Sequence, residues 1–186
     1  MKANLWNCSG SWRDVADSSR VTVGMEPGDK EPTSRWKKNM LLAEHSPIRK
    51  ITIDWIWYDL KSWVSVHFVR HHIGIEHWVK TQRSDRTGID RDKLPQDNFV
   101  THECQANAQS MINISRKRLC SNASPETREA WKAVLEEIKH QIPELYDVCV
   151  PECIYRGFCP EMKTCGYYKT SEYKRRLEHY RDIGRE

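Results

Sequence analysis

The segment Ile51–Trp57 alternates apolar and polar side chains with a period of two. Its apolar side chains fall on one face and belong to Ile51, Ile53, Trp55 and Trp57. This alternation is typical of a β-strand with one buried face. We therefore expect this tryptophan-rich strand to lie in the core or at a subunit interface.

Helical periodicity dominates the remainder of the chain. Residues 12–23 are expected to hold a short helix and a strand. Ser62 is a plausible N-cap for the second predicted helix, and Ser124-Pro125 begins the fourth, since proline suits the first helical position. Apolar stripes with helical spacing support the third and fourth. The predicted helices span residues 36–43, 63–75, 106–119, 125–140 and 171–186.

Length and composition limit the class of protein. A chain of 186 residues predicts one domain, or two at most. The mean hydropathy of −0.79 is polar for a compact monomer, whereas 10% aromatic residues argue against disorder and are compatible with an oligomer. A net charge of +4 is far below that of a dedicated nucleic-acid binder. The sequence has no apolar run of membrane-spanning length and no signal-peptide pattern at its start, so we expect a cytoplasmic protein.

Polar and basic side chains are concentrated in residues 67–91. Three interpretations remain open from the residues alone. His67 and His71 have the spacing of a zinc-binding pair but lack the glutamate of a zincin motif. A solvated basic helix face is the simplest alternative. An anion site is the third, because arginine forks and serine hydroxyls match phosphate, and Ser84 to Arg91 supplies both.

Several motifs, in order, resemble the flavin-dependent thymidylate synthases of the ThyX type. Arg70-His71-His72 and Gln82-x-Ser84-x-Arg86 resemble the two halves of the family hallmark, with a gap four residues longer than usual. Arg91 with Leu94-Pro95 resembles its Arg-x-x-Leu-Pro. The helix Asn107-Ala108-Gln109-Ser110, followed by Asn113 and Arg118, resembles its Asn-Ala-Arg-Ser helix. Further matches are Ser19-Arg20-Val21-Thr22 and Asn122-Ala123, so the resemblance covers roughly residues 10–146.

The resemblance implies an α/β (α+β) fold in which an antiparallel sheet is combined with long helices. It implies a homotetramer with FAD and nucleotide bound at subunit interfaces. The implied reaction transfers a one-carbon unit from methylenetetrahydrofolate to C5 of dUMP, with FAD reduced by NADPH as the hydride donor. No cysteine nucleophile is required, and the sequence lacks the Pro-Cys-His or Pro-Cys-Gln motif of the classical enzymes.

The resemblance also assigns roles to individual residues. Arg118 and Ser84 are the implied catalytic residues. The residues implied to bind the pyrimidine nucleotide are His67, Gln82, Ser84, Arg86, Arg91 and Arg118. Those implied to bind FAD are Ser46, Arg70, His71, His72, Asn107, Asn113 and Asn122.

Four positions depart from the family pattern. His72 stands for arginine, Thr81 for asparagine, Gln82 for glutamate and Gln109 for arginine. The phosphate-binding arginines are retained, which favours a nucleotide site. A flavoenzyme that acts on another pyrimidine nucleotide, or that adds a hydroxymethyl group, therefore stays open as an alternative.

Cysteines crowd into the C-terminal part of the chain. Cys149, Cys153, Cys159 and Cys165 are separated by three, five and five residues, with glycine and proline between them. Four thiolates suit tetrahedral zinc or an iron–sulfur cluster, while free thiols or disulfides remain alternatives. We therefore divide the chain into a synthase-like domain, 1–146, and a Cys-rich candidate metal-binding segment with a charged helical tail, 147–186.

A function of a different class also remains open for that segment. Its lysines and arginines are interleaved with Tyr167, Tyr168 and Tyr173. Basic side chains with interleaved aromatics are a feature of single-stranded nucleic-acid binders. A small zinc-dependent nucleic-acid-binding module is the corresponding alternative.

Overall fold

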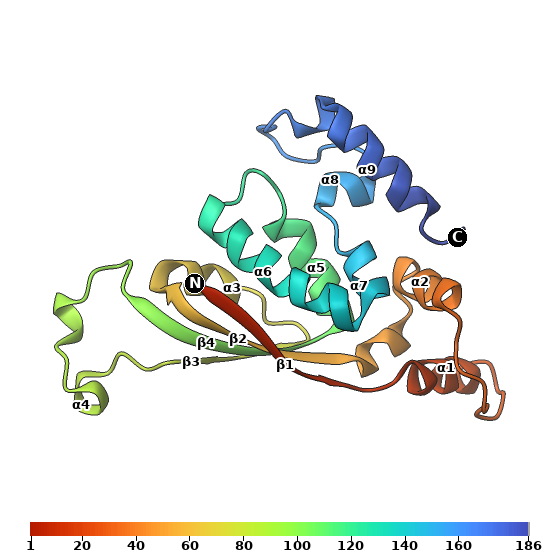
Figure 1. The fold of residues 1–186 in the computed structure, drawn as a ribbon, viewed down its shortest axis with the longest axis horizontal. Coiled ribbons are helices and arrows are strands. Elements are labelled where there is room, and N and C mark those ends of the chain that lie inside the picture. Colours follow the sequence, from red (N-terminus) through yellow and green to blue (C-terminus); the bar gives the residue numbers. More distant parts are fainter. Residues whose placement is uncertain (186) are drawn as a thin grey trace.

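The computed structural model describes residues 1–185 and contains a four-stranded antiparallel sheet with helices above one face (Figure 1). The strands are β1 (Lys2–Ser9), β2 (Thr52–Lys61), β3 (Ile75–Val79) and β4 (Phe99–Asn107). Their order in the sheet is β1-β2-β4-β3, and every pair is antiparallel. The predicted α+β class with an antiparallel sheet is confirmed.

The helices follow the strands as short and medium-length elements. The α-helices are α1 (Trp12–Val21), α2 (Ser34–Leu42), α3 (Ser62–Val69), α4 (Ser84–Thr87), α5 (Ala108–Arg118), α6 (Pro125–Gln141), α7 (Pro143–Val148), α8 (Glu152–Arg156) and α9 (Ser171–Asp182). Short 3-10 turns are η1 (Ser46–Lys50), η2 (Arg91–Lys93) and η3 (Tyr167–Lys169).

The strand predicted from the alternating tryptophans is the centre of the sheet. β2 pairs with β1 on one side and with β4 on the other. β2 runs beyond Trp57 to Lys61. A bulge between Trp57 and Leu60 interrupts the register with β4, and Asp59 there has φ of 53°. A bulge lets a strand bend while its pairing resumes on both sides.

The main core lies between the covered face of the sheet and helices α3, α5 and α6. Trp55, Trp57 and Trp131 are each 0% exposed, and Trp55 contacts Trp57 and Trp131 edge to face, with ring centroids 5.5 and 5.8 Å apart. Trp57 Nε1 donates to Ala130 O at 3.0 Å, and Trp131 Nε1 donates to Ser115 Oγ at 2.9 Å. Burial of such large rings contributes much of the stability of a core.

The alternating pattern therefore predicted the strand correctly, but two of the predicted helices extend beyond the observed ones, one at its end and one at its start. The helix predicted for 63–75 ends at Val69, and the chain then turns at Gly74, whose φ of 69° favours glycine, into β3. The predicted N-cap Ser62 is the first helical residue instead. The helix predicted to begin at Ala106 begins at Ala108, because Asn107 ends β4 and caps α5.

Other boundaries agree more closely. Ser124 caps α6 as predicted, accepting a hydrogen bond from the main-chain N–H of Thr127 at 3.3 Å. The strand expected within residues 12–23 is wrong, since α1 is followed by a turn there. Strands β1, β3 and β4 were not predicted.

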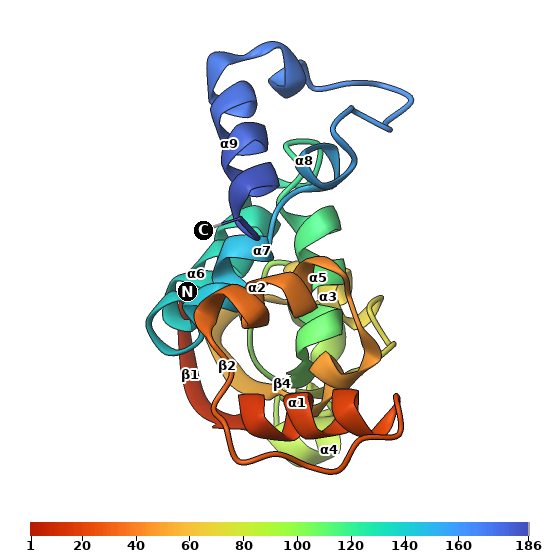
Figure 2. The ribbon, with the colours of Figure 1, turned by 90° about the vertical axis from the view of Figure 1, so that its right-hand side faces the viewer.

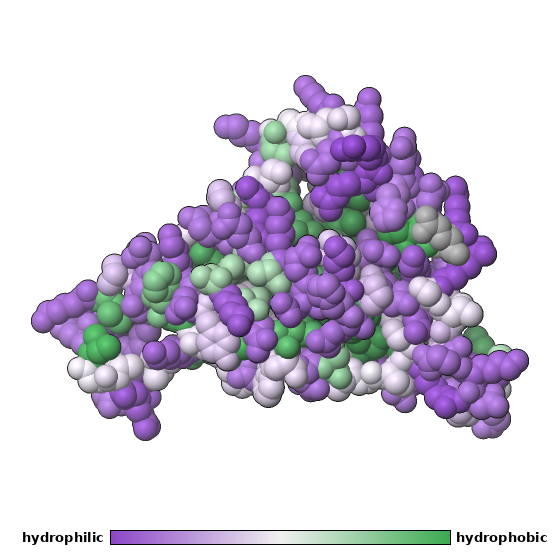
Figure 3. Space-filling view, viewed as in Figure 1, coloured by the Kyte–Doolittle hydropathy of each residue, from purple (hydrophilic) through white to green (hydrophobic). Residues whose placement is uncertain are grey.

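Two parts of the chain extend from this body. The first, residues 80–98, forms an arm that carries α4 and η2 and projects at the left of Figure 1. The arm and the strand ends beside it expose large apolar side chains, namely Trp78, Val79, Ile89 and Phe99. Green surface is visible at the end of this arm in Figure 3, whereas hydrophilic side chains cover most of the same face.

The second extension is the C-terminal segment, residues 147–185. Figure 2 shows α8 and α9 stacked beyond α5, α6 and α7, on the side away from the sheet. Val150, Ile154 and Tyr173 form a separate small core there. Ile183, just after α9, is fully buried in the main core, so the chain returns to the body at its end. None of the described helices is long and apolar enough to cross a membrane.

Candidate functional site

Arg118, the last residue of α5, joins α5 to the C-terminal end of α3. Its Nε donates to Nε2 of His71 at 2.9 Å, and its Nη2 donates to the main-chain oxygen of His67. Nη1 has no partner among residues 1–185. The guanidinium is therefore fixed in orientation while one nitrogen remains available to a ligand, which suits recognition of an anion or a carbonyl.

His67 lies in the same group and contacts α6. Its Nδ1 is 2.9 Å from Oγ1 of Thr127, which is fully buried and also contacts the capping hydroxyl of Ser124. Three elements, α3, α5 and the start of α6, thus position one polar cluster. We call His67, His71, Arg118 and Thr127 the arginine cluster.

The charges of this cluster are set by burial. Burial, followed by Arg118 and the neighbouring histidines His77 and His72, lowers the pKa of His71 to about 4, so its ring is neutral near pH 7. A neutral ring can accept the hydrogen bond from Arg118. Burial also lowers the pKa of Arg118, with a smaller contribution from Arg70, yet an arginine stays charged at neutral pH. The cluster therefore presents a single fixed cation.

Other residues predicted to bind nucleotide lie on the arm. Ser84, Arg86 and Arg91 are exposed, and Ser84 Oγ accepts a hydrogen bond from the main-chain N–H of Arg91 at 3.2 Å. Arg83, beside them, pairs with Asp85 at 2.8 Å. The side-chain nitrogen Nε2 of Gln82 is buried without a hydrogen-bond partner. Within one chain, Figure 1 places α4 at the far end of the arm from α5.

The predicted FAD residues are distributed over several elements. Arg70 and His72 are exposed directly after α3, on either side of His71, whereas Ser46 is exposed at the start of η1. Asn113 is exposed on α5 and accepts from Arg116 at 3.2 Å. The structure thus brings Arg70, His71 and His72 beside the arginine cluster and leaves Ser46 and Asn113 elsewhere on the surface.

Two of the predicted FAD residues make structural hydrogen bonds. Asn107 Oδ1 accepts from the main-chain N–H of Ser110 at 2.9 Å and so caps α5. Asn122 Nδ2 donates to the main-chain oxygen of Lys163 at 2.8 Å and so joins the loop after α5 to the C-terminal segment. Both side chains contribute to the fold in addition to any role toward a cofactor.

Sequence reasoning missed a second polar cluster, formed by β3 and β4 under α3. Nδ1 of His77, Nε2 of His102 and Sγ of Cys104 lie 3.0 to 3.3 Å from one another. His77 Nε2 donates to the main-chain oxygen of His71 at 2.7 Å, and His102 Nδ1 is 3.0 Å from Ser65 Oγ. The period-two alternation of residues 99–107, which places His102 and Cys104 on the buried face, was the signal available.

These three side chains have the chemistry of a metal site. Among residues 1–185 they are the one group of at least three histidine, cysteine or carboxylate side chains whose ligand atoms all lie within 4.8 Å of one another. A hydrogen-bonded chain also satisfies them. The Ser65 hydroxyl donates to His102 Nδ1, and His102 Nε2–H donates to His77 Nδ1. Every ring nitrogen then has a partner. Burial, followed by His77, lowers the pKa of His102 to about 4, as expected for a neutral ring. The cluster supports the strand ends that lead into His71.

The four cysteines predicted to bind metal do not gather as a set. Cys149 is buried in the main core, where it interacts with the Ser115 hydroxyl. Cys153, Cys159 and Cys165 instead line a small cavity together with Cys120, from the loop after α5. Spacing along the chain could not identify Cys120, which is separated from the others by the whole of α6 and α7.

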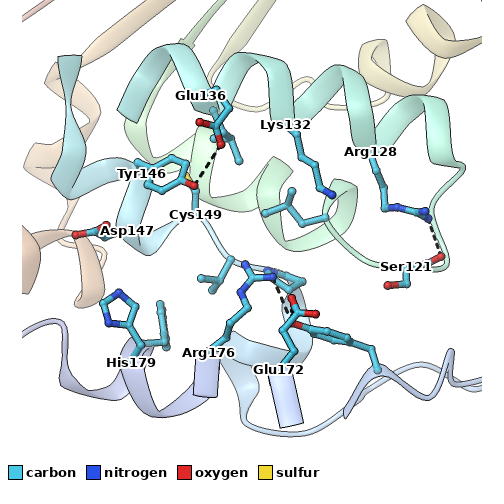
Figure 4. A pocket seen from close by; sticks show the side chains of 16 residues that line it. Ser121, Arg128, Lys132, Glu136, Tyr146, Asp147, Cys149, Glu172, Arg176 and His179 are labelled. Atoms are coloured by element: carbon cyan, nitrogen blue, oxygen red, sulfur yellow. Dashed lines mark hydrogen bonds between the residues drawn. The ribbon is translucent and has the colours of Figure 1, made fainter. Parts of the chain in front are cut away.

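A hollow lies between α6–α7 and α9 (Figure 4). It has a volume of about 650 Å³. Arg128, Lys132 and Glu136 line it from α6, and Glu172, Arg176 and His179 face them from α9. Of the predicted site residues only Cys149 lines this hollow. The hollow separates the C-terminal segment from the body and is distinct from the arginine cluster.

Comparisons with known proteins agree with this architecture. No protein-family model matches the chain. A flavin-dependent thymidylate synthase of Clostridium tetani is 36% identical over 70 residues, which are 37% of this chain and 27% of that protein. The chain therefore matches only about a quarter of that relative's length.

Two solved structures resemble the whole body. Flavin-dependent thymidylate synthase ThyX from Helicobacter pylori, complexed with FAD and dUMP, aligns with a TM-score of 0.65 and 12% identity over 81% of this chain and 100% of that chain. The UMP/dUMP methylase PolB from Streptomyces cacaoi, bound with 5-Br dUMP, aligns with a TM-score of 0.64 and 12% identity over 84% and 95%. The chain has a ThyX-like fold, which confirms the resemblance found in the sequence at the level of the fold.

Proposed function

We propose that this ThyX-like chain is a flavin-dependent enzyme that transfers a one-carbon unit to C5 of a pyrimidine nucleotide, with dUMP as the first candidate. The observation that carries the proposal is the arginine cluster. Arg118, which the sequence resemblance assigned to the nucleotide, is held by both His67 and His71, which the same resemblance assigned to the nucleotide and to FAD. Three independent motif positions thus converge at one place in the fold.

In this proposal Arg118 is the principal binding and catalytic group. A fixed cation beside a pyrimidine stabilises negative charge that develops on the ring as C5 becomes nucleophilic, and it does so without reorganisation. Because His71 is neutral, it does not compete with Arg118 as a second cation and instead orients it as a hydrogen-bond acceptor. His67, near the end of α3, borders the nucleotide.

The arm supplies the phosphate contacts. Ser84, Arg86 and Arg91 offer a hydroxyl and two guanidinium groups, which together match a dianionic phosphate. They are exposed and lie on the arm, away from the arginine cluster of the same chain. We infer that the arm reaches the arginine cluster of another subunit in a homo-oligomer, with a tetramer as the expected form. The exposed apolar side chains of the arm support such a contact.

The residues present fit FAD. Arg70 and His72 are exposed on either side of the partly buried His71, and together they offer two donors and a neutral ring beside the arginine cluster. The buried Nε2 of Gln82, which the resemblance assigns to the nucleotide, lacks a hydrogen-bond acceptor. Reduced FAD, regenerated by NADPH, would supply the hydride. Methylenetetrahydrofolate would supply the carbon, and C5 would lose its proton as tetrahydrofolate is released.

Two candidates compete for the identity of the nucleotide substrate. The likeness to PolB, a UMP/dUMP methylase, is nearly the same as the likeness to ThyX, with TM-scores of 0.64 and 0.65. The departures at His72, Gln82 and Gln109 fall within the motifs assigned to the cofactor and nucleotide. A relative that modifies another pyrimidine nucleotide, or that adds a hydroxymethyl group, is therefore the second candidate.

The nucleic-acid alternative has less support. Tyr173 is buried, its hydroxyl donates to Cys153 O at 3.3 Å, and its ring meets Tyr167 edge to face at 5.9 Å. Tyr167 is also in hydrogen-bond contact with Arg176. Two of the three tyrosines thus pack inside the segment, so they do not present faces on which bases could stack.

The visible spectrum of the purified protein tests the proposal. We expect flavin absorption that is perturbed by titration of dUMP, with UMP and dCMP as comparisons. Failure to bind FAD at any subunit concentration would overturn the flavoenzyme assignment. Perturbation by UMP or dCMP in place of dUMP would favour the second candidate.

Two variants test the individual roles. Arg86→Ala and Arg118→Lys should each weaken dUMP binding by roughly 10- to 100-fold, the cost of a lost charged hydrogen bond, while FAD remains bound. Arg35→Ala, an exposed arginine on α2, is the matched control and should leave dUMP affinity unchanged. Equal dUMP affinity in Arg86→Ala would contradict the phosphate role of the arm.

A further inference from the structure

Four cysteines from three separate parts of the chain line one small cavity in the C-terminal segment. Cys120 comes from the loop after α5, Cys153 from α8, and Cys159 and Cys165 from the loop between α8 and η3. The cavity has a volume of about 20 Å³, which is room for roughly one water-sized atom. All seven cysteines of the chain are free thiols, so no disulfide accounts for this convergence.

The thiols also interact with one another electrostatically. Cys153 interacts with Cys120 and Cys159, and Cys120 interacts with Cys165 and Cys159. Thiolates placed this close repel one another unless a cation lies between them.

The loop that carries Cys159 and Cys165 is bounded by Gly157 and Gly166, with φ of 77° and 83°, which let the backbone turn sharply around one centre.

The C-terminal segment also has too small a hydrophobic core to explain why it is folded. Its own cluster of buried residues consists of Val150, Ile154 and Tyr173. A structured unit with so few buried side chains usually depends on a disulfide or a metal. The hydrogen bond from Asn122 to Lys163 O joins the two loops that carry the cysteines.

We propose that Cys120, Cys153, Cys159 and Cys165 bind one Zn²⁺ ion in a tetrahedral site. Four thiolates are a standard ligand set for structural zinc, with Zn–S distances of about 2.3 Å. No three of these sulfurs lie within 4.8 Å of one another among the described residues, so binding requires the loop of Cys159 and Cys165 to close toward Cys120 and Cys153. Cys165 is exposed and its loop is free of regular structure, which permits that closure.

The site has a consequence for the body. Cys120 follows Arg118 by two residues. A metal bound to Cys120 therefore holds the C-terminal end of α5, from which Arg118 reaches His71. Zinc at this position is structural and acts on the arginine cluster through position alone.

The test is the metal content of the full-length chain and of single cysteine variants, measured by mass spectrometry after dialysis. We expect one zinc per chain in the wild type, and loss of at least 10-fold in zinc affinity for Cys120→Ser and Cys165→Ser. Cys149→Ser and Cys104→Ser are the matched controls and should keep the metal. The second control separates this site from the cluster of His77, His102 and Cys104.

Several outcomes would overturn the proposal. These are a wild type without zinc after growth with zinc, a Cys120→Ser protein that keeps its zinc, and loss of zinc in Cys149→Ser or Cys104→Ser. Visible absorption with labile sulfide would assign an iron–sulfur cluster instead, and intact-mass detection of disulfides among the four would also exclude the site.

If Cys120→Ser does not fold, cobalt titration of the wild type decides. Co²⁺ bound to four thiolates gives intense visible bands that zinc abolishes by competition. Bands typical of nitrogen–sulfur ligation, or none, would contradict the four-cysteine assignment.

Discussion

Residues 1–146 pack around three fully buried tryptophans, whereas residues 147–185 have a separate core of Val150, Ile154 and Tyr173. The body covers a whole sheet face with α3, α5 and α6. The C-terminal segment instead contacts the body through short elements and through Ile183, and a hollow of about 650 Å³ lies between them. The difference shows that burial alone can account for the body but not for the segment, which needs ligation or docking to be ordered.

The largest effect is expected from the body. Trp131→Ala removes a ring that is 0% exposed and takes one aromatic neighbour from both Trp55 and Phe68. We expect a loss of about 3–5 kcal/mol in the free energy of unfolding, measured by urea denaturation. Trp6→Ala, at a position 61% exposed, is the control and should change it by less than about 0.5 kcal/mol. Similar losses in both variants would refute a core organised around Trp131.

The packing of the C-terminal segment against the body should depend on the side chain of Ile183. Ile183→Ala empties a fully buried site in the main core and should cost about 2–4 kcal/mol. Because Ile183 anchors the end of α9, limited proteolysis should cut α9 faster while the body stays resistant. Ile73→Ala, 78% exposed, is the matched control. Unchanged proteolysis in Ile183→Ala would mean that the segment is held in some other way.

Acid should weaken the body through its buried histidines. The pKa values of His71 and His102 are both about 4 in the folded chain, below the ordinary value of 6.5. The unfolded chain therefore binds protons first, and the stability is present above pH 6.5 and is lost as the pH falls toward 4. We expect a loss of about 2 kcal/mol, less than the full shifts imply because His71 remains partly solvated.

Urea denaturation between pH 7 and pH 4 measures that loss. His102→Gln should flatten the dependence, and His140→Gln, on the exposed face of α6, should leave it as in the wild type. A wild-type stability independent of pH in this range would show that neither ring is kept neutral by the fold.

The smallest effect is expected at the start of α9. Thr170 Oγ1 accepts from the main-chain N–H of Tyr173 at 3.1 Å. Thr170→Ala should cost about 1 kcal/mol, and Thr170→Ser should restore most of it. Hydrogen exchange should report the change in α9 and not in the sheet. Faster exchange in β2 as well would show that segment and body unfold as one unit.

Local patterns in the sequence determined a substantial part of this protein. The period-two tryptophan strand, the long helix from Pro125 and its Ser124 cap follow from residues adjacent in the chain, so they were predictable. The ordered motifs at Arg70-His71 and Arg118 pointed to the ThyX-like fold, which the comparisons bear out. The roles of these residues toward nucleotide and FAD remain predictions.

Tertiary structure alone decided which residues meet across long separations. The helix predicted for 63–75 ends at Val69, and β3 begins at Ile75, because Gly74 turns the chain into pairing with β4. His102 joined His77 through that pairing, and Cys120 joined Cys153, Cys159 and Cys165 because α5 ends beside α8. Periodicity reports only which face of an element is buried. Which faces meet depends on how the elements pack, and that information is not local to any stretch of the sequence.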